Sequence, residues 1–191
     1  MTRIWLVRHA PTHAKAAIGW TDMEADLSDT AALDRLDAHL PRPARLISSD
    51  LKRAAATAAA LSRDRALMSA KPDLREVHFG EWEGLSFEDI ARRDPARSVA
   101  FWEAPATTPA PGGEALGDVA ARVGPVLEGL AGADEDIVVV CHMGAILAAL
   151  AHTTAMPLPV VMRFVIAPLS VTRVTHLGRG GWRVDSVNHV L

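Results

Sequence analysis

The chain has 191 residues, of which 49% are hydrophobic and 23% are charged, with a formal net charge of −3. This length suits one domain with a substantial core, and the balance of residues is that of an ordinary globular protein. Nucleic acid and anionic membranes attract basic surfaces, so the net negative charge gives no reason to expect either as a partner. An anionic substrate therefore needs a local basic pocket.

The cysteine content and the apolar stretches bear on where the protein works. Cys141 is the single cysteine, which excludes an intramolecular disulfide and fits a reducing compartment. The first residues lack the charged region, long apolar region and cleavage site of a signal peptide. The most apolar stretch, 137–151, is interrupted by His142 and is shorter than the roughly 20 residues that span a bilayer. We therefore expect a cytoplasmic protein.

The first predicted strand, residues 3–8, ends in the pair Arg8 and His9, and Pro11 follows shortly after. In open α/β sheets the ligand crevice lies beyond the carboxyl ends of the strands. The pair is thus placed where a reactive group belongs, although an Arg-His dipeptide is also typical of a solvated strand end.

The next segment predicts a loop, a helix and a second strand. Residues 10–28 show no helical or strand period, whereas apolar residues at helical spacing predict a helix from Ser28 or Asp29 to about Leu40. Prolines end this helix, and residues 44–48 predict the second strand.

Arg53 falls in the first turn of the following predicted helix, residues 51–61, for which residues 48–50 offer N-cap side chains. This turn lies beside the end of the second strand, and free backbone N–H groups at a helix N-terminus favour an anion. Arg53 is therefore a candidate anion ligand, with an ordinary solvated arginine as the alternative.

The middle of the chain predicts a functional loop and a cover. Residues 66–75 contain a short third strand, and residues 74–85 mix aromatics, glycines and acids in a way that fits neither a helix nor a strand. A helix is expected from about Ser86. The proline-rich segment 94–113 resembles a covering loop or helical cap.

A second histidine follows a strand in the last third of the chain. An amphipathic helix is predicted over 114–130 and a buried strand over 137–140, which is followed by His142 and a helix over 145–151. A histidine satisfied within the core is the usual interpretation, but His142 repeats the placement of His9. Two strands, 169–175 and 182–187, flank a glycine-rich hairpin at 178–181. Without repeats or linkers, one α/β domain over 1–191 is the economical interpretation.

Four motifs, in this order, resemble the histidine phosphatase superfamily, which includes the cofactor-dependent phosphoglycerate mutases. They are Leu6-Val7-Arg8-His9-Ala10-Pro11-Thr12, Ser48-Ser49-Asp50-Leu51-Lys52-Arg53-Ala54, Leu74-Arg75-Glu76 with Phe79-Gly80 and Trp82-Glu83-Gly84, and Val140-Cys141-His142 before Gly144. Each motif alone is weak, but the ordered set is specific and covers nearly the whole chain.

The resemblance implies a three-layer α/β/α fold with a mostly parallel sheet, and phosphoryl transfer through a phosphohistidine without a metal or cofactor. His9 is the implied nucleophile and Glu76 the implied proton donor, which the residues alone do not separate from Glu81 or Glu83. Arg8 and Arg53 suit bidentate contacts with phosphate oxygens, and His142 adds a donor. Further candidates for phosphate or substrate binding are Thr12, Lys15 and Met143.

Several functions remain open at this stage. We favour hydrolysis of a small phosphomonoester, because a mutase must retain a bisphosphorylated intermediate with extra basic residues over the site, for which Arg92, Arg93 and Arg97 are the candidates. Within the family, the chain looks most similar to the α-ribazole phosphatase-like branch. A mutase, a non-catalytic binder of phospho-ligands and a regulator acting on phosphoprotein are the alternatives. A homodimer through exposed tryptophans or residues 160–162 is also expected.

Overall fold

The computed structural model describes residues 1–179 and 181–191. The strands are β1 (Thr2–Arg8), β2 (Arg45–Ser48), β3 (Ala66–Leu67), β4 (Asp136–Cys141), β5 (Val171–His176) and β6 (Trp182–His189). The α-helices are α1 (Thr30–His39), α2 (Lys52–Ser62), α3 (Phe87–Arg93), α4 (Pro95–Glu103), α5 (Leu116–Ala131), α6 (Met143–Thr154) and α7 (Leu158–Val161). Short 3-10 helices include η1 (Pro72–Leu74) and η2 (Gly80–Trp82).

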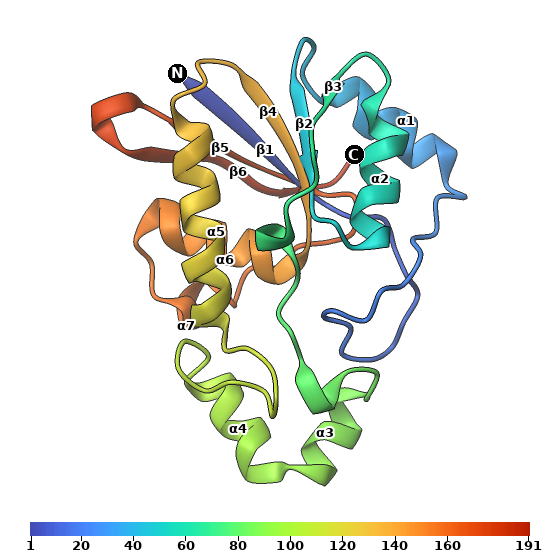
Figure 1. Ribbon diagram of the computed structural model, residues 1–191, viewed down its shortest axis with the longest axis vertical. Helices are drawn as coiled ribbons and strands as arrows, with labels where there is room; N and C mark the ends of the chain where they lie inside the picture. The colour runs from blue at the N-terminus through green and yellow to red at the C-terminus, as the bar shows by residue number, and fades with distance from the viewer.

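The strands within the described residues form one sheet in the order β3-β2-β4-β1-β5-β6. Strands β3, β2, β4 and β1 run parallel to one another, whereas β5 pairs with β1 antiparallel and β6 pairs with β5 antiparallel. The parallel register pairs Arg8 with Cys141, so β1 and β4 end at the same level (Figure 1). The residues that follow these strands in sequence are thereby brought together at the carboxyl end of the sheet.

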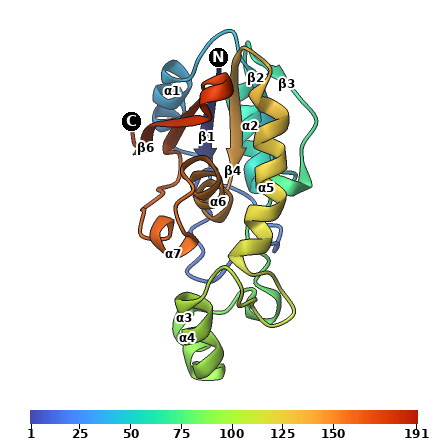
Figure 2. The ribbon, with the colours of Figure 1, turned by 90° about the vertical axis from the view of Figure 1, so that its left-hand side faces the viewer.

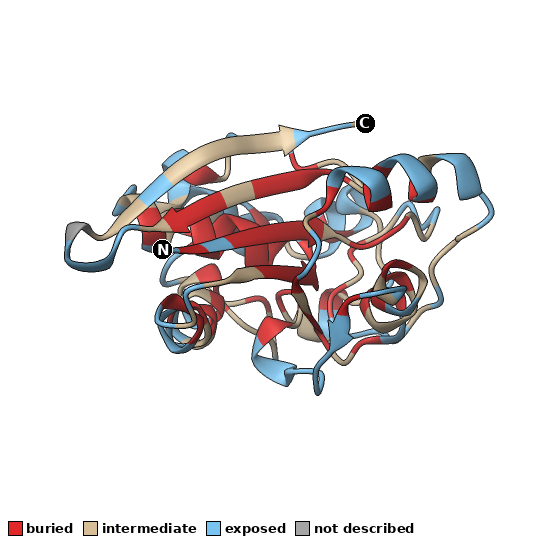
Figure 3. Ribbon diagram, turned by 90° about the horizontal axis from the view of Figure 1, so that it is seen from above, coloured by how far each residue is buried: buried red, intermediate tan, exposed pale blue. Residues whose placement is uncertain are grey.

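Helices cover both faces of the sheet (Figure 2). Successive residues of a strand point to opposite faces, and in β1 both sets are apolar. Leu6 packs in the cluster formed with α5 and α6, whereas Val7 packs in the cluster formed with α1 and α2. The inner strands are buried and β6 at the edge is mostly half-buried (Figure 3). The three-layer α/β/α fold with a mostly parallel sheet is therefore confirmed.

The helix caps agree with the sequence at two places and differ at one. Asp29 caps α1 by accepting a hydrogen bond from the backbone of Ala32, and Ser86 caps α3. The prediction that residues 48–50 cap α2 is wrong, because Leu51 occupies the cap position without a side-chain bond. Asp50 instead pairs with Arg75.

The covering segment is helical. Helices α3 and α4 project together beyond the carboxyl end of the sheet, below its strands in Figure 1. The chain returns from α4 to α5 through a loop that includes Pro111, Gly112 and Gly113. The predicted hairpin is present as β5 and β6, but Gly180 of its turn lies outside the described residues. In the stretch expected to support a dimer, Val161 is fully buried and Val160 is exposed. Among the helices that the structure describes, none combines the length and apolar character needed to cross a membrane.

Candidate active site

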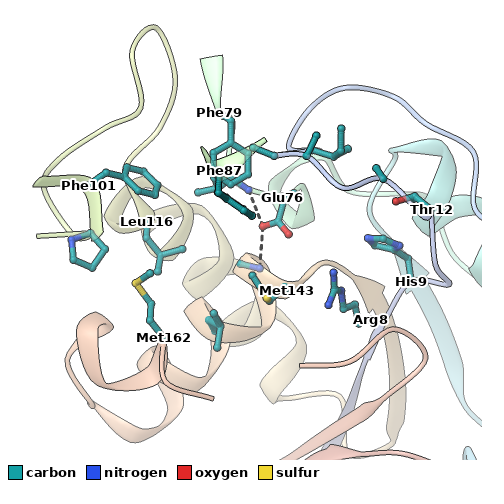
Figure 4. Close-up of a pocket in the computed structure, with 18 of the residues that line it drawn as sticks. Arg8, His9, Thr12, Glu76, Phe79, Phe87, Phe101, Leu116, Met143 and Met162 are labelled. Carbon is teal, nitrogen blue, oxygen red and sulfur yellow. Dashed lines mark hydrogen bonds between the residues drawn. The ribbon is translucent and has the colours of Figure 1, made fainter. Parts of the chain in front are cut away.

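The residues that follow β1, β2 and β4 meet at the carboxyl edge of the sheet. The ring of His9 lies 5.0 Å from that of His142, centroid to centroid. Arg53, in the first turn of α2, lies 3.2 Å from His9 between its Nε and the imidazole Nε2. A cavity of about 400 Å³ opens at this point, lined by Arg8, His9, Arg53 and Glu76 (Figure 4). Strand topology thus assembles groups that lie far apart in sequence.

The ring of His9 is held in one tautomer. Its Nδ1 lies 2.7 Å from the carbonyl oxygen of Ala10, and because a carbonyl only accepts, Nδ1 carries the hydrogen. Nε2 then carries no hydrogen, and its lone pair accepts the hydrogen bond from Nε of Arg53. Burial, together with the neighbouring charges of Arg53 and Arg8, lowers the pKa of His9 to about 3, although the hydrogen bond to Ala10 opposes the shift. His9 is therefore a neutral imidazole with an available nitrogen nucleophile.

Arg53 is buried and fixed by backbone carbonyls. Its two terminal nitrogens donate to the carbonyl oxygens of Thr21 (2.9 Å) and Gly19 (2.6 Å). Those carbonyls belong to a loop that Glu83 organises, since its carboxylate accepts hydrogen bonds from the backbone N–H groups of Gly19, Trp20 and Thr21. Burial by itself would raise the pKa of Glu83, but these bonds outweigh it and the pKa is lowered. Hydrogen bonds thus connect Glu83 to His9 through the 19–21 loop and Arg53.

Arg8 approaches the cavity from the end of β1. One terminal nitrogen donates to the carbonyl oxygen of Ile166 at 2.5 Å, and its Nε is buried without a partner in the described part of the chain. Burial lowers the pKa of Arg8, while Glu76 raises it. A guanidinium stays charged at neutral pH, so Arg8 and Arg53 bring two positive charges to the ring of His9.

Glu76 is the carboxyl group that reaches this centre. Its Oε1 accepts hydrogen bonds from the backbone N–H groups of Val77 and Gly144, both at 2.9 Å (Figure 4). Burial raises its pKa, although the hydrogen bond from Val77 and both arginines oppose the shift, and a raised pKa favours the protonated form of a carboxyl group. Glu81 is exposed and pairs with Arg93. Burial and position therefore distinguish Glu76 from Glu81 and Glu83, which the sequence could not do.

Gly144 allows Glu76 to approach α6. A Cβ built on residue 144 would lie 2.2 Å from Oε1 of Glu76, closer than any real contact. Residue 144 must therefore be glycine for Glu76 to accept the hydrogen bond from its N–H group.

His142 is fully buried and is not among the residues that line the cavity. Both ring nitrogens lack a hydrogen-bond partner within the described residues. Burial lowers its pKa well below the usual value, and its position beside His9 and Arg53 adds to this effect. A neutral, unpartnered imidazole beside His9 has one N–H to offer. The adjacent Cys141 is buried, and burial raises the pKa of its thiol to about 12.

The three remaining predicted contacts line the wider cavity. Thr12 is half-buried, and Lys15 is exposed on the segment that follows it. Met143 is 39% exposed at the start of α6. These residues border the opening, whereas His9, Arg8, Arg53 and Glu76 line the inner part of the cavity and His142 lies buried beside His9.

Sequence reasoning missed Arg122 of α5. Its guanidinium pairs with Glu114 through two hydrogen bonds of 2.9 Å. It also donates to the backbone carbonyl oxygens of Asp73, Arg75 and Glu76. Arg122 therefore fixes the loop that carries Glu76. The only sequence signal was an arginine on the polar side of an amphipathic helix, which is normally solvated.

The described residues include no group of three or more His, Cys, Asp or Glu side chains placed to hold a metal ion. The positive charge at the centre comes from Arg8 and Arg53, and Glu76 adds a buried carboxyl group. Nucleophile, anion ligands and acid are the set that phosphoryl transfer through a histidine requires.

A family model described as the histidine phosphatase superfamily (branch 1) matches residues 4–190. The chain belongs to this superfamily, and the predicted resemblance is confirmed. Relatives of similar sequence include named phosphatases, so the protein is an enzyme of the phosphomonoesterase class.

Three relatives illustrate the range of this similarity. The glucosyl-3-phosphoglycerate phosphatase of Mycolicibacterium vanbaalenii is 33% identical over 172 residues, which are 81% of this chain and 75% of that protein. The native structure of a mycobacterial glucosyl-3-phosphoglycerate phosphatase aligns with a TM-score of 0.84 and 28% identity over 98% of both chains. The adenosylcobalamin/alpha-ribazole phosphatase of Salmonella typhimurium is 33% identical over 107 residues, 52% of either protein. The predicted similarity to α-ribazole phosphatases is therefore found.

Proposed function

We propose that this chain is a single phosphatase domain, residues 1–191, that hydrolyses the phosphomonoester of a small metabolite without a metal ion. The named relatives act on small phosphorylated compounds, which supports this class of substrate. The observation that carries the mechanism is the environment of His9. Its Nδ1 is fixed by Ala10, and its Nε2 lies at the cavity beside Arg53, with Arg8 also lining it.

In the first step, the Nε2 lone pair of His9 attacks phosphorus and the bond to the leaving oxygen breaks. Glu76 gives its proton to that oxygen, so the alcohol leaves neutral. Arg8 and Arg53 hold the phosphoryl oxygens and balance their charge, and a ring N–H of His142 is available as a further donor.

In the second step, the Glu76 carboxylate takes a proton from water as the water oxygen attacks phosphorus. The bond between phosphorus and Nε2 breaks, which restores neutral His9 and releases inorganic phosphate. Glu76 is again protonated, so the two steps form a closed cycle.

The cap, which is the covering segment formed by α3 and α4, supports hydrolysis over mutase activity. Arg92 pairs with Asp89 on the exposed face of α3, and Arg93 pairs with Glu81. Neither they nor Arg97 line the cavity. The basic residues that a retained bisphosphorylated intermediate would need are therefore turned away from the site. The predicted homodimer and cytoplasmic location stay predictions.

The test is phosphate release from 4-nitrophenyl phosphate with EDTA present, in the parent protein and in His9→Ala. His13→Ala is the matched control, since His13 is an exposed histidine of the same loop that pairs with Asp26. We expect chelator-resistant activity in the parent and His13→Ala, and none in His9→Ala. An alkaline quench during turnover should trap phosphate on His9, because phosphohistidine is labile to acid.

Activity that survives in His9→Ala would show that His9 is not the nucleophile. Binding of phosphate without hydrolysis of any ester would instead favour a binding protein.

A further inference from the structure

The cavity has two chemically different ends. The titratable residues that line it are Arg8, His9, Arg53 and Glu76 at the reacting centre, and Lys15 on the exposed segment after Thr12. The other end is formed by apolar side chains from α3, α4, α5, the loop over residues 74–85 and the residue after α7. They are Phe79, Phe87, Phe101, Trp102, Leu116 and Met162, here called the apolar wall.

The reaction fixes which part of a substrate meets the apolar wall. In-line displacement places the leaving oxygen on the side of phosphorus opposite to Nε2 of His9. Glu76, which must reach that oxygen, lies between His9 on one side and the labelled residues of the apolar wall on the other (Figure 4). The carbon skeleton of the leaving alcohol therefore extends from Glu76 toward the apolar wall.

The outer part of the apolar wall is unusually exposed. Phe87 is 53% and Trp102 is 44% exposed, although both are large aromatic residues. They belong to neighbouring helices of the cap and contact each other edge to face, with ring centroids 5.9 Å apart. An exposed aromatic pair that continues into a cavity is the form of surface that an apolar ligand covers.

The apolar wall is an unfavourable environment for a polar leaving alcohol. Hydroxyl, ammonium or carboxylate groups would lose water against phenyl rings and methionine without gaining partners. An apolar alcohol instead gains from each methylene that leaves water, roughly two- to fourfold in affinity.

We infer that the substrate is a phosphomonoester of an apolar alcohol, aryl or alkyl, whose hydrocarbon part contacts the apolar wall. This inference rests on the proposed function and specifies its substrate class. It separates the chain from a phosphatase for sugar or amino-acid phosphates, because those leaving groups carry several polar groups.

The test compares kcat/KM for esters whose leaving groups are all primary alcohols. Ethyl, butyl and hexyl phosphate form the apolar series, and glycerol 3-phosphate and phosphoserine are the polar probes. We expect a rise of roughly two- to fourfold for each methylene over part of the series, and hexyl phosphate at least tenfold above both polar probes.

The double variant Phe87→Ala/Trp102→Ala tests the apolar wall itself. Both side chains are partly exposed, so their removal leaves the buried core in place. We expect the ratio of kcat/KM for hexyl over ethyl phosphate to fall several-fold. Val99→Ala is the matched control, because Val99 is 55% exposed on α4 and does not line the cavity. It should leave the ratio unchanged.

The outcomes separate the substrate class from the reaction. Preference for phosphoserine or glycerol 3-phosphate, lost in Lys15→Gln, would overturn the inference and assign recognition to Lys15 while leaving the phosphatase mechanism intact. A hexyl-to-ethyl ratio near one, or one that the double variant leaves unchanged, would also overturn it. If His9→Ala hydrolyses these esters as fast as the parent, the proposed function fails.

Discussion

The Nε of Arg53 donates a hydrogen bond to Nε2 of His9 across 3.2 Å. The lone pair of His9 is therefore directed at the guanidinium group for which we propose phosphate binding. Because Gly19 and Thr21 hold the other two nitrogens of the guanidinium, its plane is fixed before any substrate arrives.

Replacing Arg53 by lysine should disable the site. An ammonium group lacks the planar fork and cannot keep both backbone carbonyls while it binds phosphate. We expect kcat/KM to fall by about 10²–10³-fold in Arg53→Lys. Arg63→Lys, just beyond the end of the same helix and paired with Asp34 on the surface, should retain parent activity. Equal losses in the two variants would refute this role.

The rate should depend on pH through Glu76. Its proton is available only below its raised pKa, whereas His9, with a pKa of about 3, is already unprotonated above that pH. For an alkyl phosphate we therefore expect kcat/KM to fall as the pH rises through the pKa of Glu76.

Glu76→Gln should abolish this alkaline fall and lower kcat/KM by about 10²–10⁴-fold. The loss should be smaller for 4-nitrophenyl phosphate, whose alcohol leaves readily without a proton. Titration of the substrate phosphate is common to both proteins, so the comparison isolates Glu76. An unchanged alkaline fall in Glu76→Gln would assign the proton donor elsewhere.

Adding one methyl group at residue 144 should displace the acid. The new Cβ would lie 2.2 Å from Oε1 of Glu76, so the carboxyl group must move. Since a shift of about 1 Å in a catalytic group reduces rates about 100-fold, Gly144→Ala should lose that much in kcat.

Gly129→Ala is the matched control for that variant. Gly129 lies in α5 with open space where a Cβ would be. Alanine should stabilise the helix there by about 1 kcal/mol and leave turnover unchanged, as urea unfolding and initial rates would reveal. Full activity in Gly144→Ala would mean that the position of Glu76 is not critical.

Glu83 should act on the reaction through Arg53. Glu83→Gln replaces one accepting oxygen by an NH₂ group that faces backbone donors, which costs about 1–3 kcal/mol in the free energy of unfolding. We expect kcat/KM to fall about tenfold and KM to rise, because the loop that orients Arg53 loosens. Glu81→Gln is the control, because Glu81 is exposed and lies two residues before Glu83. It should change stability by less than about 0.5 kcal/mol. The idea fails if phosphate affinity is the same in both variants.

Strand-end residues were the predictable part of the site. Arg8, His9 and His142 follow apolar runs that form neighbouring parallel strands, and such strands end together at one edge. Arg53 was predictable for the same reason, since α2 starts where β2 ends. These positions follow from sheet geometry, which apolar patterns reveal.

Other parts of the site depend on packing that patterns do not encode. Glu76, Glu81 and Glu83 are equivalent in sequence, and only burial against Gly144 distinguishes Glu76 as the candidate acid. Arg122 resembles any polar residue of an amphipathic helix, although it binds three backbone carbonyls. Asp50 was expected to contribute to a cap, but Arg75, 25 residues away, binds it instead. These interactions join residues far apart in sequence, so they depend on the tertiary fold.

Cys141 lies at the end of β4, next to His142 and fully buried, with its thiol pKa raised to about 12. Only a thiolate reacts readily with alkylating agents and oxidants, and this thiol stays protonated and covered. A phosphatase that uses histidine as its nucleophile and keeps its one sulfhydryl out of reach should continue to work under oxidative stress. Iodoacetamide should therefore leave its turnover unchanged until the protein unfolds.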